Sequence, residues 1–361
     1  MDRATDSAIL CFATQGQGHL DEQRVLALLE PLAPRAFAFE RAHKLRSGLA
    51  LLRTARRERP RLIVMEGTGI AGGLAVLAAR ALLGVPYVVS SGDAVGPYLG
   101  LRGRLPGFLG GSYERLLCRR CAGFIGWTPY LVGRALTFGA PRAMCAPGWA
   151  RGRAGTDARR RVRADLGIPE DTIVAGLVGS LQLGKRSGYV YGAELIRAVR
   201  TVARADVAVC VVGDGSGLDG LRELAGEDLG RRVFLPGRVA PEEVPDHLAA
   251  FDLASLPQSV DGVGSFRYST KLSEYLDAGL PILTGQIPAA YDLDEGQIVR
   301  LPGPAPWSPV YIEALASFLE GLSAERLVEL REAAAGARER SAGMFSREQQ
   351  RTRVCAFVSE L

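Results

Sequence analysis

Hydroxyl, ammonium and carboxylate groups stand close together in the stretch 264–281, GSFRYSTKLSEYLDAGLP. Ser269, Thr270 and Lys271 come directly before an apolar-periodic run closed by Gly-Leu-Pro, which predicts a helix with hydroxyl residues at its start. The free N–H groups and positive dipole end of such a helix, together with Lys271, can hold a diphosphate. Glu274 follows one turn later, where it can accept hydrogen bonds from the vicinal hydroxyls of a sugar. A capped helix of the core has the same pattern, and this alternative stays open.

A second set of anion-binding features follows the apolar run Ile173–Val178, which predicts a buried strand. The strand ends in a glycine and Ser180, and the cations Lys185 and Arg186 follow. A helix is expected from about Gly188. A strand, a glycine-containing loop, a cation and a helix are together typical of a phosphate cradle.

Three further apolar runs predict the next strands, at 207–212, 233–239 and 252–256. From about residue 173 to 285 this order of strand ends resembles the C-terminal domain of the GT-B glycosyltransferases, specifically the retaining family-4-like group that uses nucleotide sugars. The resemblance implies that Lys185 binds the donor diphosphate and that Arg238 and Val239 meet the base. It also implies that Glu274 holds the ribose and that neither a metal nor a cofactor is required.

The chain departs from this family pattern at two positions. The family usually has Arg where Ser180 stands, and an acidic residue where this chain has Phe266. We expect Arg267 or Arg186 to supply the missing positive charge and Asp261 to supply the missing carboxylate.

The N-terminal half begins with a strand, a glycine-rich loop and a helical pattern, which is a Rossmann-like unit. Gly16 and Gly18 match part of the dinucleotide motif, and Glu40 ends the next expected strand, at 36–39, so NAD binding stays open. The resemblance instead directs this loop to the donor phosphate or to the acceptor. His19 is then an acceptor-side residue, with a surface histidine at a helix start as the alternative.

Strands and helices go on alternating to residue 146, which predicts a parallel sheet with helices on both faces. The expected ligand edge carries the strand ends 16–19, 66–69 and 90–93. Family members often have a His-Asp pair after the fourth strand, whereas this chain has a glycine and Asp93. Trp149, after the last strand, is expected either to stack near the ligand or to cover the hinge.

The segment 98–111, YLGLRGRLPGFLGG, is predicted to be a loop. Its apolar residues, arginines and glycines fit a mobile acceptor loop, a contact with an anionic membrane surface, or a loop packed on its own domain.

The donor-binding residues expected from these patterns are Gly16, Gly18, Ser180, Arg186, Gly213, Arg238, Val239, Asp261, Arg267, Ser269, Thr270 and Lys271. The expected catalytic residues are Lys185, Glu274 and Asp93, and the expected acceptor-side residues are His19 and Trp149. The pairs Cys118/Cys121 and Asp292/Asp294 have metal-like spacing, but without further ligands we expect no metal site.

Composition sets the class of the protein. Its 361 residues are 47% hydrophobic and 23% charged, with a net charge of +5, which fits two folded domains and excludes a disordered chain. No interleaving of basic and aromatic residues suggests nucleic-acid binding. Six scattered cysteines indicate a reducing compartment, and neither a signal peptide nor a membrane span is recognised. We therefore expect a cytoplasmic protein, with a peripheral contact at the inner face of the membrane as an open alternative.

These patterns predict an α/β protein of GT-B type, with two Rossmann-like, doubly wound parallel-sheet domains facing a cleft. The expected parts are an acceptor-side domain at 1–150, a linker at 151–165 with its arginines on a solvated face, a nucleotide-sugar-binding domain at 166–342 and a helix at 343–361 that packs back on the first domain. The expected function is a retaining transfer from a nucleoside diphosphate sugar, with UDP as the expected nucleotide, to a glycan, a lipid-linked sugar or a small metabolite. An NAD-dependent oxidoreductase and a non-catalytic nucleotide-sugar-binding protein are the alternatives.

Overall fold

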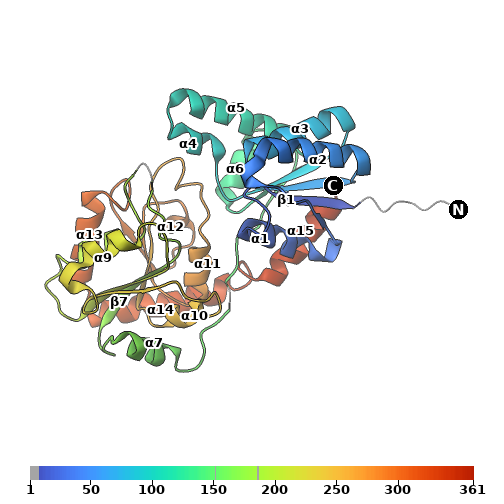
Figure 1. Ribbon diagram of the computed structural model, residues 1–361. Coiled ribbons are helices and arrows are strands. Elements are labelled where there is room, and N and C mark those ends of the chain that lie inside the picture. The colour runs from blue at the N-terminus through green and yellow to red at the C-terminus, as the bar shows by residue number, and fades with distance from the viewer. Residues whose placement is uncertain (1–7, 151, 185–186) are drawn as a thin grey trace. The chain divides into compact units, whose positions relative to one another are not determined.

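The computed structural model describes residues 8–150, 152–184 and 187–361, so Lys185 and Arg186 lie outside the described residues. The chain forms two compact units, whose elements are labelled in Figure 1. Unit 1 comprises the residues up to Gly148 together with Phe266–Tyr268 and Ser346–Leu361, and unit 2 comprises Trp149–Ser265 and Ser269–Phe345.

Unit 1 is built on a parallel sheet of six strands. They are β1 (Ile9–Ala13), β2 (Arg35–Ala36), β3 (Leu62–Glu66), β4 (Tyr87–Ser91), β5 (Gly123–Gly126) and β6 (Ala143–Cys145). Their order is β2-β1-β3-β4-β5-β6, so the strand order reverses between β1 and β3. All residues of β1, β3 and β4 are buried, as expected for strands covered on both faces. Ligands of such sheets bind outside the carboxyl ends of the strands, at this reversal.

Helices cover both faces of this sheet (Figure 1). They are α1 (Leu20–Leu29), α2 (Lys44–Glu58), α3 (Ile70–Leu83), α4 (Val95–Gly100), α5 (Arg104–Arg120), α6 (Pro129–Thr137) and α15 (Arg347–Ser359). Residues of α2, α3, α5 and α6 form one hydrophobic core with sheet residues such as Phe12, Met65 and Tyr87. The C-terminal helix α15 packs on α1, where the Cys355 thiol donates to the carbonyl of Leu28 at 3.2 Å.

Unit 2 repeats this architecture. Its strands are β7 (Ile173–Val178), β8 (Val207–Val212), β9 (Val233–Gly237), β10 (Leu253–Leu256), β11 (Ile282–Gly285) and β12 (Ile298–Leu301). They are parallel and lie in the order β12-β11-β10-β7-β8-β9, with the reversal between β10 and β7. The ligand edge of this sheet is therefore expected where the chain leaves β7 and β10.

The helices of unit 2 are α7 (Ala158–Leu166), α8 (Ala193–Val199), α9 (Leu218–Ala225), α10 (Val244–Ala249), α11 (Thr270–Asp277), α12 (Ala289–Asp292), α13 (Pro309–Gly321) and α14 (Ala324–Ser341). Residues of α8, α9 and α13 pack against Leu177, Val209 and Leu283 of the sheet in one continuous core. In the described part of the chain, no helix combines the length and apolar character that crossing a membrane requires.

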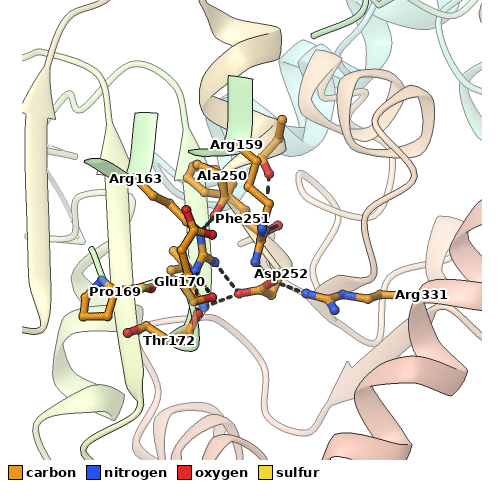
Figure 2. Close-up of polar contacts among 11 residues, drawn as sticks. Arg159, Arg163, Pro169, Glu170, Thr172, Ala250, Phe251, Asp252 and Arg331 are labelled. Carbon is orange, nitrogen blue, oxygen red and sulfur yellow. Dashed lines mark hydrogen bonds and ion pairs between the residues drawn. The ribbon is translucent and has the colours of Figure 1, made fainter. Parts of the chain in front are cut away.

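A buried carboxylate, Asp252, joins α7, β7 and α14 (Figure 2). Arg163 is fully buried and donates to Asp252 at 2.7 Å and to four backbone carbonyls. Arg159 donates to the same carboxylate at 2.7 Å, Arg331 also pairs with it, and the Val174 N–H donates to it at 2.7 Å. The expectation that all arginines of the stretch 151–165 lie on a solvated face is therefore wrong for Arg163.

The segment 98–111 is helical, so the prediction of a loop is wrong. Its residues 98–100 form the second half of α4 and its residues 104–111 form the start of α5, and the two helices contact each other through glycines. A Cβ on Gly107 would lie only 2.8 Å from the Cα of Gly100. Close packing of two backbones requires glycine here, although glycine disfavours an isolated helix.

Two other boundaries differ from the prediction. The helix expected from about Gly188 begins at Ala193, because Gly188 and Gly192 have positive φ values of 60° and 95°, which do not continue a right-handed helix. The strand expected at 36–39 is confined to the two residues of β2.

Candidate functional site

The loops that follow β7, β8 and β9 are held together at the carboxyl edge of unit 2. The Gly179 N–H donates to the Val212 carbonyl at 2.9 Å, and the Gly213 N–H donates to the Gly237 carbonyl at 2.8 Å. Gly213 has a φ of 147°, and a Cβ there would lie 1.8 Å from the Gly179 carbonyl oxygen. Glycine is therefore required for the loops to approach each other.

Lys271 extends from the first turn of α11 to the loop after β7. A Cβ on Gly179 would lie 2.7 Å from the Lys271 Nζ, so the ammonium lies directly against this glycine. Nζ also lies 5.0 Å from the ring centroid of Tyr191, a cation–π contact. Ser269 is the N-cap of α11, and within the described residues its side chain makes no capping hydrogen bond. Thr270, the first residue of the helix, is exposed.

The position of this ammonium is favourable for binding an anion. Gly179 ends β7 and α11 follows β10, so the contact lies at the reversal of strand order in unit 2. The N–H groups at the start of α11 add positive potential. The chain contains 44 lysines and arginines, and just three of them, Lys44, Lys185 and Lys271, are lysines. Two of these three belong to the diphosphate site expected from the sequence.

Glu274 lies one turn into α11 and is 9% exposed. It lines a pocket of about 210 Å³ together with Val244 of α10 and Arg338 of α14. Helix α10 follows the loop that carries Arg238, which is exposed, and Val239, which is half-buried. The structure thus places Glu274, the residue expected to bind the ribose, next to α10, the helix that follows the loop expected to bind the base.

Other residues expected at the site have local partners or stand apart. Ser180 is exposed directly after β7, and Trp149 is half-buried at the start of unit 2. The Asp261 carboxylate accepts two backbone N–H groups of its own turn, each at 2.8 Å. Asp294 pairs with Arg300 and accepts two backbone N–H groups. Among the residues that the structure describes, no group of three or more His, Cys, Asp and Glu side chains could hold a metal ion.

In unit 1, Asp93 forms an ion pair with Arg267. The Arg267 Nε donates to Asp93 Oδ1 at 2.7 Å, and the two side chains are 35% and 52% exposed. Phe266 packs on the hydrophobic core of unit 1, and the Tyr268 N–H donates to the Gly92 carbonyl at 3.1 Å. Arg267, expected to bind the donor, is therefore engaged with the expected catalytic carboxylate.

Trp127 fills the space beside Gly92. A Cβ on Gly92 would lie 2.7 Å from Cε3 of the indole, so a histidine, the usual residue of the family pattern, does not fit without movement of the ring. The indole stacks under the Arg24 guanidinium at 4.0 Å, and its Nε1 donates to Glu66 at 3.2 Å. The packing of Trp127 is thus a physical reason for glycine at this position.

Glu66 and Arg24 form a buried ion pair at the end of β3, with 3.2 Å between Oε2 and Nη1. Burial raises the pKa of Glu66 to about 7, against the opposing effects of Arg24, Ser90 and Trp127. Sequence reasoning missed Glu66, Arg24 and Trp127 as a group. A signal was present, because Glu66 is a charged residue that ends an apolar strand at the expected ligand edge.

The glycine-rich loop after β1 is closed by residues of its own helix. The Gly18 N–H donates to the Glu22 carboxylate at 2.6 Å, and His19 caps α1 by accepting the Asp21 N–H at 3.3 Å. Gly16 is buried and His19 is exposed. The Glu22 carboxylate occupies the helix-start position where a dinucleotide would place its pyrophosphate, which disfavours NAD binding at this loop.

Two family models match this chain. Residues 173–304 match the model described as glycosyl transferases group 1, and residues 2–148 match the model described as glycosyl transferase 4-like domain. The comparison with curated proteins gives no match.

Several solved structures share the fold over nearly the whole chain. HepE from Anabaena, in complex with UDP and glucose, is 17% identical with a TM-score of 0.70, covering 98% of this chain and 100% of its own. Sucrose-phosphate synthase from Thermosynechococcus elongatus is 13% identical with a TM-score of 0.73, covering 98% of each chain. The UDP-forming α,α-trehalose-phosphate synthase from Burkholderia vietnamiensis is 11% identical with a TM-score of 0.67, covering 100% of each chain. The predicted GT-B fold is confirmed.

Proposed function

Because this chain belongs to the group 1, family-4-like glycosyltransferases, we propose that it transfers a sugar from UDP-sugar to an acceptor hydroxyl with retention of anomeric configuration. The observation that carries the proposal is the Lys271 ammonium, which lies against Gly179 at the strand reversal of the half matching the group 1 model. UDP is favoured because HepE was solved with UDP and the trehalose-phosphate synthase is UDP-forming.

Lys271, the N–H groups at the start of α11 and the hydroxyls of Ser269 and Thr270 bind the donor diphosphate. When the bond between sugar and phosphate breaks, negative charge develops on the phosphate oxygens, and a positive site fixed in advance stabilises that charge. Lys185 and Arg186 add further cations in this proposal, which for these two residues rests on the sequence pattern of a phosphate cradle and on the family resemblance.

The rest of the donor is bound by neighbouring elements of unit 2. Glu274 accepts hydrogen bonds from the ribose hydroxyls, and the loop carrying Arg238 and Val239 contacts the base. Gly213 permits the close loop packing that keeps this edge in place. A carboxylate that is nine-tenths buried is a suitable acceptor for two hydroxyls, because each hydrogen bond to a charged group contributes about 1.5–3 kcal/mol.

The acceptor is bound at the carboxyl edge of unit 1, where Asp93 and His19 lie. The leaving phosphate takes the proton of the acceptor hydroxyl on the same face of the sugar, so the reaction requires neither a side-chain base nor a metal ion. The acceptor class is a glycan, a lipid-linked sugar or a small metabolite, and the reaction is expected in the cytoplasm.

Calorimetric titration with UDP tests the diphosphate site, using Lys271→Met with Lys44→Met as the matched control. Lys44 is an exposed lysine at the start of α2 in unit 1. Loss of one charge-assisted contact of about 1.5–3 kcal/mol predicts a tenfold to hundredfold weaker Kd for Lys271→Met and an unchanged Kd for Lys44→Met. Equal UDP affinity in both variants, or no UDP binding by the wild type, would refute the assignment.

A second candidate function is a nucleotide-sugar-binding protein without transferase activity. It is favoured by Phe266, which packs against the core of unit 1 where the family has a carboxylate, and by Trp127, whose ring leaves no space for a histidine at Gly92 unless the ring moves. Incubation with UDP-sugars distinguishes the two functions, because a transferase slowly releases free sugar from its donor. Proton NMR identifies the anomer of the sugar that is released first, which tests retention. The rate of sugar release in EDTA tests whether a metal ion is required.

A further inference from the structure

Helices α4 and α5 form a hairpin whose internal contact is made by glycines, and Figure 1 shows the two helices side by side. A Cβ on Gly96 would lie 3.0 Å from the Cα of Gly111, and a Cβ on Gly110 would lie 2.8 Å from the Leu99 side chain. Together with the contact of Gly107 on Gly100, this brings the two backbones close along the hairpin. Small residues at a helix contact are typical of helices that pack in lipid.

Glycines fill much of the contact between the two helices, and six large apolar side chains of the hairpin are exposed to solvent. The exposed fractions are 47% for Tyr98, 54% for Leu101, 67% for Leu105, 72% for Phe108, 57% for Leu109 and 46% for Leu116. On α5 the last four share one face, since their spacing follows the helical repeat. This outward face carries an apolar stripe, interrupted at Ser112, of a kind that monomeric soluble proteins seldom leave in contact with water.

The charged residues of the hairpin have one sign on the surface. Residues 95–120 contain five arginines and one acidic residue, Glu114. All five arginines are exposed. The Glu114 carboxylate is buried and bound to Arg134 by two hydrogen bonds of 2.8 Å and to the Gly96 N–H at 3.0 Å. The exposed surface of the hairpin is therefore apolar and basic, with no acidic side chain.

Two hydroxyl groups attach the hairpin to unit 1, one of them at the ligand edge of the sheet and one at the start of β4. The Tyr113 hydroxyl donates to the carbonyl of Thr68 in the loop after β3, at 3.2 Å, and the Tyr87 hydroxyl of β4 donates to the Leu117 carbonyl at 2.8 Å. A Cβ on Gly73 of α3 would lie 1.8 Å from the Tyr113 hydroxyl oxygen. The apolar stripe is thus presented by a rigid element.

We propose that the α4–α5 hairpin binds the surface of a bilayer that contains anionic lipids. Its apolar stripe, centred on Leu105, Phe108 and Leu109, enters the boundary between headgroups and acyl chains, with α5 parallel to the membrane plane. The flanking arginines, Arg104, Arg115 and Arg119 among them, extend to the lipid phosphates. A bilayer accounts for the surface of the hairpin better than a protein partner does. The apolar stripe matches the acyl layer, and the flanking arginines, which have no exposed carboxylate among them, match the anionic headgroups.

The test is co-sedimentation of the full chain with vesicles of phosphatidylcholine, alone or mixed with phosphatidylglycerol. The wild type is expected to bind the mixed vesicles and to bind pure phosphatidylcholine more weakly. The double variant Phe108→Ser with Leu109→Ser is expected to lower the partition coefficient by at least about tenfold. The matched control is Leu82→Ser with Val328→Ser, which removes two exposed apolar side chains outside the hairpin and is expected to leave binding unchanged.

A third variant separates the contribution of charge. Arg102→Gln with Arg104→Gln is expected to weaken binding to the mixed vesicles alone and to reduce its dependence on salt. Circular dichroism checks that each variant is folded. We expect folded variants because the substituted side chains are exposed.

Three results would overturn the proposal. They are no sedimentation of the wild type with mixed vesicles, equal binding by the Phe108→Ser/Leu109→Ser variant, and a lipid-independent dimer of the wild type that this variant dissociates. The last result would assign the stripe to a second copy of the chain.

Discussion

The Asp252 cluster provides a graded test of how burial determines the contribution of an ion pair. Arg163→Met removes a fully buried guanidinium that binds Asp252 and four carbonyls, while leaving a side chain of similar length. Removal of one partner of a buried pair typically costs about 3–5 kcal/mol. Asp252 keeps Arg159 and Arg331, but the four carbonyls lose the donor that Arg163 supplies. Arg331→Met removes a partner of the same carboxylate, but this arginine is 44% exposed, so the expected cost is at most about 1 kcal/mol.

Unfolding in urea, followed by far-ultraviolet circular dichroism, measures both variants against the wild type. We expect the midpoint for the unit 2 transition to fall markedly for Arg163→Met and by at most about a third as much for Arg331→Met. The N–H of Val174 also donates to Asp252, so hydrogen exchange of this amide in β7 is expected to accelerate in Arg163→Met. Equal losses of stability in the two variants would refute the reasoning, because they would show that burial does not set the cost.

Two other predictions concern buried groups at the ligand edges. The raised pKa of Glu66 means that protonation favours the folded state, so its contribution is full below about pH 4.5 and is lost by about pH 7. Relative to Glu66→Gln, the wild type is expected to lose about 3 kcal/mol of unfolding free energy over this range in urea titrations, and a flat difference would contradict the assignment. Gly213→Ala is expected to lose about 2–4 kcal/mol through strain and overpacking and to weaken UDP binding. Gly220→Ala, in an open position on α9, is expected to leave UDP binding unchanged and to raise the unfolding free energy by about 0.5–1 kcal/mol; equal effects would contradict the requirement for glycine at 213.

The alternation of strands and helices was predictable because the buried strands are short apolar runs that stop at a glycine, a proline or a polar residue. The run 173–178 is an example, since all six residues are buried in the structure. Lys271 was predictable as a residue of a helix start. Its approach to Gly179 was not, because this contact depends on the order of β7 and β10 in the sheet, which the sequence does not state.

The missed features are those in which distant parts of the chain decide the environment of a residue. Glycines at 100 and 107 suggested a loop, whereas they allow two helices to touch. In the sequence, Arg163 cannot be told apart from the exposed arginines next to it. Its burial depends on Asp252 and on carbonyls of later residues, which surround it only in the folded structure. Trp127 follows the last residue of β5 and Arg24 lies in α1, and nothing local to either residue indicates that they stack on each other beside Gly92.

The three residues Phe266–Tyr268 belong to unit 1, although the chain on both sides of them belongs to unit 2. Arg267 forms an ion pair with Asp93, and Ser269, two residues later, is the N-cap of α11. A molecule whose hydroxyls or cation competes for the Asp93 carboxylate would loosen this segment and, through a few covalent bonds, the first turn that carries Lys271. If Asp93 binds the acceptor and Lys271 binds the donor, as proposed above, binding of one substrate would change the affinity for the other, and the two would bind in a preferred order.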